Sequence, residues 1–224
     1  MRPPDAAVPE DEPAGFAFDA MLGTTFPISL GPSLSLEIPG RVLLQGEVGW
    51  LPPGYGSAIV GIVEGVGDED AILGPAIENA VNNSLVLRLS AGWRPFADYG
   101  FEFFAGYTTI GVNGEADPVV VGDIIDGEVG AIIETELTEN IDVSARLHNF
   151  HVALGWRFLA LRDHLVIRAS LGYTQTVGAG GDLEISERPE VEEQARPIFQ
   201  SELSRILRRD VKLPLIGISA GYRF

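Results

Sequence analysis

The sequence predicts an all-β membrane protein: an eight-stranded, antiparallel, up-and-down transmembrane β-barrel with α-helical extracellular insertions. Three observations support this prediction. Apolar residues recur at every second position in eight segments, the positions between them are small or charged, and the connections alternate in length. A period of two is typical of strands with two unlike faces. An even number of strands is what a closed up-and-down barrel with both ends on one side requires.

The apolar rows follow one another along the chain. In the sixth segment Leu147 and Phe150 cannot share a face, so we expect that strand to slip in phase near His148, Asn149 and Phe150, with a β-bulge absorbing the slip. The eight rows occupy residues 16–22, 34–38, 42–50, 85–93, 101–107, 141–161, 165–173 and 216–224.

The connections predict a barrel with two different ends. Tight turns are expected at Pro39-Gly40, at Ala97-Asp98-Tyr99 and at Arg162-Asp163, because Gly, Pro and Asp favour turns. At the opposite end only the first connection, near Gly31-Pro32-Ser33, is expected to be short. Outer-membrane barrels have short turns at one rim and long loops at the other. The long connections span about 51–83, 112–140 and 178–211.

Aromatic residues indicate that the apolar face meets lipid rather than the interior of a soluble barrel, which is the alternative fold. Six of the apolar rows contain a Gly followed directly by Trp or Tyr. Trp and Tyr gather at the two interfaces of a membrane, where their rings suit the headgroup level. The predicted aromatic girdle comprises Trp50, Trp93, Tyr107, Trp156 and Tyr173.

The other face of the strands is rich in Gly and Ser and carries Arg and Glu side chains. Of the 15 basic residues, 14 are Arg, whose guanidinium pairs with carboxylates in two directions and stays charged. A narrow eight-stranded lumen is filled by side chains, so small residues must alternate there with a few long ones. The predicted lumen charge network comprises Glu47, Arg88, Glu102, Arg146 and Arg168. Arg94, Arg157 and Arg223 share this face.

The C-terminal segment GISAGYRF ends on an aromatic residue, with apolar residues at alternating positions before it. This segment resembles the assembly signal of bacterial outer-membrane β-barrel proteins, and residues 15–224 resemble the small barrels of the OmpA and OmpX kind. The resemblance implies the bacterial outer membrane as location, and its lipids, its lipopolysaccharide and the barrel-assembly machinery as partners. The second, third and fourth outer connections are longer and less loop-like than those of the smallest members of this family. The signal would consist of Ile216, Ile218, Ala220, Tyr222 and Phe224.

Composition excludes other classes. The net charge of −17 argues against nucleic acid as a partner, because phosphate binding needs basic patches. No uninterrupted apolar run reaches the roughly 18 residues of a membrane helix, and the chain has no Cys. Residues 1–14 are expected to be an acidic, Pro-rich, disordered segment without the apolar core of a signal peptide. We expect residues 15–224 to form one monomeric barrel.

Helical spacing of apolar residues predicts insertions at about 57–83, 112–140 and 179–210 that pack into one cap. Asp117-Pro118 is expected to open a helix, Gly127 to break it, and Pro197 to open another that ends at Arg208-Arg209. The expected apolar stripes are Leu73, Ala76, Ile77, Ala80 and Val81; Val121, Ile124, Ile125, Ile132, Ile133 and Leu137; and Phe199, Leu203, Ile206 and Leu207.

The long connections also hold 21 of the 32 acidic residues. An acidic cap is able to attract cations, but Asp68-Glu69-Asp70 lacks the spacing of a calcium loop. We therefore expect a solvated surface that resists aggregation, and no metal site.

Enzyme signals are weak. Some outer-membrane barrels that remove acyl chains from lipid A use Ser, His and an acid, and the segment RLHNFH resembles such a set only loosely. The candidates are His148, His151, Ser144 and either Glu136 or Glu139, while His164 lies in a turn. We expect no catalytic residues and no cofactor. The favoured function is structural or surface interaction through the acidic cap; the alternatives are a narrow channel for small solutes or ions, and a lipid A-modifying enzyme.

Overall fold

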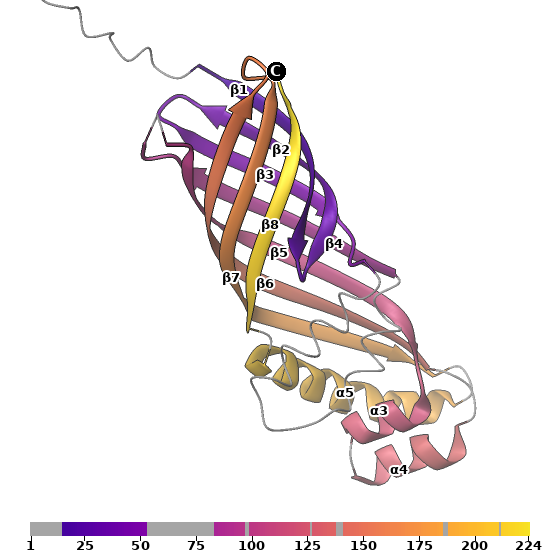
Figure 1. The fold of residues 1–224 in the computed structure, drawn as a ribbon. Coiled ribbons are helices and arrows are strands. Elements are labelled where there is room, and N and C mark those ends of the chain that lie inside the picture. The colour runs from indigo at the N-terminus through magenta and orange to yellow at the C-terminus, as the bar shows by residue number, and fades with distance from the viewer. Residues whose placement is uncertain are drawn as a thin grey trace, which may run out of the picture.

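In the computed structural model, residues 15–52, 83–96, 99–125, 127–137, 141–185, 188–210 and 212–224 are described. Eight antiparallel strands form one closed barrel, in which β8 pairs with β1 (Figure 1). The predicted fold class is confirmed. The strands are β1 (Ala17–Phe26), β2 (Ser29–Ile38), β3 (Val42–Gly49), β4 (Asn83–Trp93), β5 (Phe101–Ala116), β6 (Ile141–Ala160), β7 (Leu165–Glu184) and β8 (Lys212–Arg223).

The two ends of the barrel differ. The turns between β2 and β3 and between β6 and β7 lie at the same end as the C-terminus, which we call the turn end. The helices gather at the opposite end, the helix end (Figure 1). Strands β5, β6 and β7 have 16, 20 and 20 residues and continue past their neighbours there, whereas about 9–11 residues suffice to cross a membrane.

The first turn lies at Pro27 and Ile28, so the prediction near Gly31-Pro32-Ser33 is wrong. Those three residues belong to β2, where Gly31 meets a close approach of the next strand. A Cβ at Gly31 would lie 2.1 Å from the carbonyl oxygen of Val48. Glycine is needed there for packing rather than for a turn.

The expected irregularity in the sixth strand is present, but the extra residue belongs to its neighbour. The register between β6 and β7 shifts between His148 and Asn149, which pair with Gly178 and Thr176. Val177 therefore has no counterpart across the ladder. Strand β6 keeps its alternation, which means that Leu147 faces inward and Phe150 outward without any slip in phase.

Three helices are described: α3 (Pro118–Ile125), α4 (Gly127–Glu136) and α5 (Pro189–Asp210). The Asp117 carboxylate accepts a hydrogen bond of 2.9 Å from the Val119 amide, as expected for an N-cap. Gly127, with a φ of 74°, lies at the predicted break. Among the described helices, none is long and apolar enough to span a membrane.

Helix α5 begins at Pro189, so the prediction that Pro197 opens it is wrong. Pro189 occupies the first helical position, which tolerates the missing amide donor. Pro197 lies inside the helix, where proline removes one hydrogen bond. The helix continues through it because buried residues recur every fourth position. They are Val191, Ala195, Phe199 and Leu203.

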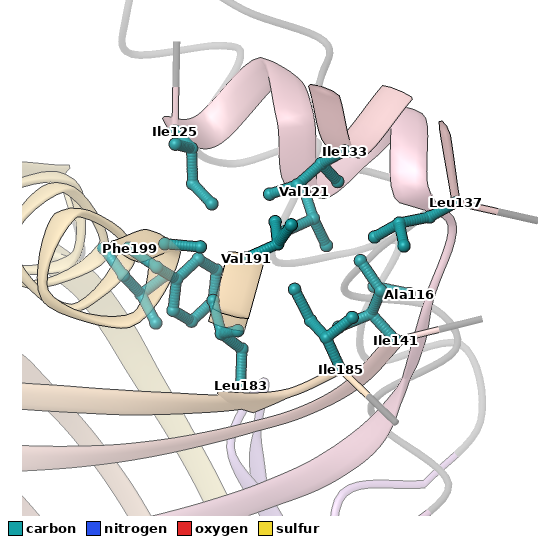
Figure 2. Packing of buried hydrophobic residues seen from close by; sticks show 12 residues of the cluster. Ala116, Val121, Ile125, Ile133, Leu137, Ile141, Leu183, Ile185, Val191 and Phe199 are labelled. Atoms are coloured by element: carbon teal, nitrogen blue, oxygen red, sulfur yellow. The ribbon is translucent and has the colours of Figure 1, made fainter. Parts of the chain in front are cut away.

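The helices pack on the inward side of the extended strands and form one apolar cluster with them (Figure 2). Ile125 and Ile133 from the second insertion lie in the same cluster as Phe199 and Leu203 from the last. Leu203 lies directly over Gly181 of β7, where a Cβ would be 2.3 Å from the leucine Cδ2. Residues 1–14, the first expected stripe from Leu73 to Val81, and the side chains of residues 206–209 lie outside the described part.

Candidate functional site

The lumen near the turn end is filled by a network of buried charges. Arg157 lies at its centre: its Nη1 donates to Glu37 at 2.8 Å, and its Nε lies 3.5 Å from Glu102. Asp19 is 4.0 Å from the same guanidinium. Three carboxylates from β1, β2 and β5 therefore surround one arginine of β6, which the closed barrel brings together from distant parts of the sequence.

Arg168 of β7 extends the network toward the middle of the barrel. Its Nε donates to Glu102 at 2.8 Å, and its Nη1 lies 3.3 Å from the amide oxygen of Gln45. The guanidinium also sits over the ring of Phe104, 5.4 Å from its centre, which is a cation–π arrangement. Glu102 has no exposed surface.

Two further arginines close the network at the turn end. Arg223 of β8 donates to Asp19 at 2.7 Å and to Glu37 at 3.1 Å. Arg94, which follows β4, pairs with Glu37 as well. Buried charges are tolerated only when paired, and each of these arginines contacts at least one carboxylate.

A second polar layer lies nearer the helix end and centres on Glu47 and Arg88. Their side chains form an ion pair of 3.0 Å. Ser29 donates to the other oxygen of Glu47 at 2.5 Å, and Arg88 donates to Thr25 at 2.8 Å and to Thr108 at 3.3 Å. Glu47 and Arg88 face one another because they pair across β3 and β4.

An apolar layer lies directly beyond the Glu47–Arg88 pair. Val86 follows Arg88 two residues closer to the helix end on β4, and Ile110 follows Thr108 in the same way on β5. Both pack with three other buried side chains, which are Ile28, Leu51 and Leu215. From the turn end to the helix end, the described part of the lumen therefore has two layers of ion pairs followed by one apolar layer.

A small, partly open cavity of about 60 Å³ is lined by residues of both charged layers. A buried water needs roughly 10–15 Å³ of cavity volume, so this cavity has room for about four waters. Arg168 lies on the side of the turn end and Arg88 on the side of the helix end. The remaining wall is made largely of small residues of β1, β4, β7 and β8, among them Gly23, Ser90, Ser170, Gly217 and Ser219.

The structure brings four of the five predicted network residues into the lumen as two pairs, Glu47 with Arg88 and Glu102 with Arg168. Arg146 does not join them, and its assignment to the lumen is wrong. Its side chain is exposed on the outer face of β6. The assignment assumed a slip in phase within β6, whereas the unmatched residue is in β7.

Sequence reasoning missed Asp19 and Glu37, which make several of the network contacts. Both are buried, and both stand between apolar neighbours in the first two strands. Their alternation with Phe18 and Ala20, and with Leu36 and Ile38, was the available signal. The sequence places Arg157 and Arg223 on the correct face, outside the predicted network.

The five predicted girdle residues are all exposed on the outside of the barrel. The pairing registers divide them into two sets. Trp93 and Trp156 lie toward the turn end, opposite Phe103 and Phe101 of β5. Trp50, Tyr107 and Tyr173 lie further toward the helix end.

The predicted assembly residues face outward on β8. Ile216, Ile218, Tyr222 and Phe224 are exposed. The Phe224 amide donates to the Phe18 carbonyl at 2.9 Å, and the two rings lie 5.8 Å apart. The final aromatic residue is thus held against the first strand.

The candidate catalytic residues are not brought together. His148 stacks on Tyr107 and shares a hydrogen bond of 2.7 Å with its hydroxyl, while Glu136 pairs with Arg188. His151 faces the lumen, between Ser90 at 3.0 Å and Thr108 at 3.1 Å. The position that a triad gives to a carboxylate is therefore held by a threonine hydroxyl. Glu139 lies outside the described residues.

The described residues contain no group of three or more His, Asp or Glu arranged to hold a metal ion. His164 lies in the turn between β6 and β7 and stacks on Tyr222 at 5.2 Å.

A closed eight-stranded antiparallel barrel with an apolar exterior and a charged interior is the architecture of small outer-membrane barrels. No family model matches the chain, and no curated protein sequence matches it. Among solved structures, the chain is similar to the N-terminal β-barrel domain of Pseudomonas aeruginosa OprF, with 11% identity over 93% of this chain and 96% of that one and a TM-score of 0.39.

Two other solved structures are similar over nearly their whole length. A major outer membrane protein from Thermus thermophilus is 14% identical over 94% of this chain and 100% of that one, with a TM-score of 0.47. Acinetobacter baumannii CarO is 12% identical over 95% of this chain and 98% of that one, with a TM-score of 0.38.

Proposed function

We propose that the chain is an integral β-barrel of a bacterial outer membrane, with a structural or surface-interaction role and without enzymatic activity. The observation that carries this proposal is the inverted distribution of side chains. Large apolar residues surround the outside of the barrel, while Asp19, Glu37, Glu47 and Glu102 are buried inside with their arginines.

The outer surface is too apolar for water. Leu89 is 71% exposed, and exposed apolar side chains occur on all eight strands. Soluble monomers rarely expose a contiguous apolar patch larger than a few hundred Å². In a membrane the same band is buried in hydrocarbon, and the closed barrel leaves no unpaired strand edge.

The two ends support an orientation. Short turns face the periplasm in outer-membrane barrels, and longer excursions face the outside. The turn end is then periplasmic, and the helices form an extracellular cap. Exposed acidic residues of α3 and α4, including Asp123, Glu128 and Glu134, make its outer surface negative. Such a surface suits recognition by a neighbour, while outer-membrane lipids and lipopolysaccharide surround the barrel.

The layered lumen favours a closed barrel over a channel. Water and ions entering from either end meet paired charges, and the apolar layer of Ile28, Leu51, Val86, Ile110 and Leu215 opposes wetting. A narrow channel remains the second candidate, because the cavity between Arg88 and Arg168 supplies part of a polar path.

The barrel-assembly machinery is the proposed partner during biogenesis. Its contact would be the outward row of β8, from Ile216 to Phe224, which stays exposed in the free barrel.

Two measurements test the proposal. The first asks whether the protein folds without detergent, and the second asks whether protein refolded in detergent conducts in a planar bilayer. We expect the protein to fold only with detergent or lipid, to migrate differently on gels before and after heating, and to show no steady conductance in a planar bilayer. A stable monomer in plain buffer would contradict the membrane assignment. Steady single-channel steps would replace the closed-barrel role with the channel.

A further inference from the structure

The cavity between the two charged layers has a cationic lining. Arg88 and Arg168 are each more than nine-tenths buried, and both line it. Glu47 is the carboxylate among the lining residues, and its two oxygens are occupied by Ser29 and Arg88.

The arginines of this lumen are not fully satisfied by the protein. Within the described residues, the Nη2 atoms of Arg88 and of Arg168 make no hydrogen bond. Nη2 of Arg168 lies 3.8 Å from a carboxylate oxygen of Asp19, beyond hydrogen-bond distance. Buried guanidinium N–H groups without an acceptor are costly, so an acceptor for them is expected.

The charge balance points the same way. The network contains five arginines, namely Arg88, Arg94, Arg157, Arg168 and Arg223, and four carboxylates, namely Asp19, Glu37, Glu47 and Glu102. One positive charge is therefore left over among these residues. In a narrow interior with a low dielectric constant, an uncompensated charge favours uptake of a counter-ion.

The size and polarity of the cavity restrict the ligand. A volume of about 60 Å³ admits a single small anion with one or two waters rather than a sugar or a nucleotide. Ser90, Ser170 and Ser219 line the space. The Ser90 hydroxyl shares a hydrogen bond with His151 and the Ser219 hydroxyl donates weakly to the sulfur of Met21, but a serine hydroxyl can rotate to donate to an anion. We propose that this cavity binds one small monovalent anion, of the halide or short carboxylate class, between Arg88 and Arg168.

Bromide provides a direct test on the unaltered protein. The protein is refolded and crystallised in bromide, so that the ion does not have to enter a finished barrel, and anomalous scattering locates it. A peak inside the cavity, in contact with Arg88 or Arg168, is the expected result. Bromide peaks confined to the cap or the outer surface, with ordinary water in the cavity, would overturn the proposal.

A cavity-filling variant gives a second test that keeps both arginines. Wild-type protein should unfold at a higher urea concentration in chloride than in gluconate at equal ionic strength, because gluconate is too large for the cavity. In Ser219→Leu that difference should disappear. Ser144→Leu, on β6 outside the cavity lining, is the matched control and should retain it. An equal chloride effect in wild type and Ser219→Leu would also refute the site, whether or not the barrel conducts.

Discussion

Strand β6 passes through two regions whose faces have opposite polarity. Near the turn end its outward residues are apolar and its inward residues are polar. Beyond Phe150 the polarity reverses, while the backbone alternation continues unchanged. In the first region Phe150, Val152, Leu154, Trp156 and Phe158 face outward, and Asn149, His151 and Arg157 face inward. In the second, Arg146, Ser144 and Asp142 face outward, and Leu147, Val143 and Ile141 face inward.

Under the proposed membrane location, this difference follows from the medium outside the strand, which decides which face is apolar. Where lipid surrounds the barrel, the charged side chains are inside and paired. Where water surrounds the extended strands, an ordinary hydrophobic core forms under α3, α4 and α5. The reversal between Phe150 and Arg146 therefore marks the expected membrane surface on β6. Gln175 of β7 pairs with Phe150, Lys212 of β8 pairs with Gln175, and both polar side chains are exposed at this level.

The largest effect is expected from the charged region. Replacing Glu102 with Ala removes the closest carboxylate of Arg168 in a buried site, and leaves Arg157 with Glu37 as its close partner. Breaking a buried pair in this way costs about 3–5 kcal/mol, measured as the free energy of unfolding by urea in detergent. Glu202→Ala, which removes a solvent-accessible partner of Arg205 on α5, should cost less than about 1 kcal/mol. Equal losses for the two variants would mean that the lumen is hydrated and its charges screened.

The apolar region should respond to loss of volume instead. Phe199 is buried in the apolar cluster formed by α3, α4, α5 and the extended strands (Figure 2), and Phe199→Ala should destabilise the cap by about 3 kcal/mol through the cavity it leaves. Hydrogen exchange should quicken in α3, α4 and α5 but not in β1 to β4, since the cap is built on β5 to β7. Ile198→Ala, at the exposed neighbouring position, is the control and should leave exchange nearly unchanged. Faster exchange throughout the barrel would contradict a separate cap core.

Two arginine substitutions on the outward face of β6 test where the membrane ends. Leu154 lies in the middle of the apolar band, whereas Ser144 lies beyond the reversal on the same face. Leu154→Arg should cost about 2–4 kcal/mol in lipid vesicles, and Ser144→Arg about 0–1 kcal/mol. Similar costs at the two positions would show that the band is not the lipid-facing surface.

The sequence was sufficient for the barrel because alternation is a local property of each strand. It also identified Glu47, Arg88, Glu102 and Arg168, since charges on the face opposite an apolar row have few other places to go. It was insufficient where partners depend on register between strands. A one-residue irregularity in β7 decides which β7 residues share a face with the part of β6 nearest the helix end. Nothing in the sequence of β6 indicates this irregularity.

The helices show the same limit. The four-residue spacing of Phe199 and Leu203 predicted a helix, but the helix begins earlier, at Pro189. The earlier residues Val191 and Ala195 are buried in the apolar cluster with the extended strands, and this burial outweighs the local cost of Pro197. That the cap lies along β5 to β7 follows from the unequal lengths of the strands, which the turn signals alone did not define.

The smallest effect is expected at Arg146, and its comparison with Arg168 tests where the boundary between the two regions lies. Arg146 and Arg168 are both arginines on adjacent strands, and both were expected in the lumen. Arg168 contacts Glu102 and Asp19 inside the barrel, so Arg168→Ala should cost several kcal/mol, as for other broken buried pairs. Arg146 is exposed beyond the reversal, so Arg146→Ala should change the free energy of unfolding by no more than about 0.5 kcal/mol. Urea titrations of both variants in the same detergent provide the measurement. A loss at Arg146 comparable to that at Arg168 would place its side chain inside and require the extra residue to lie in β6 after all.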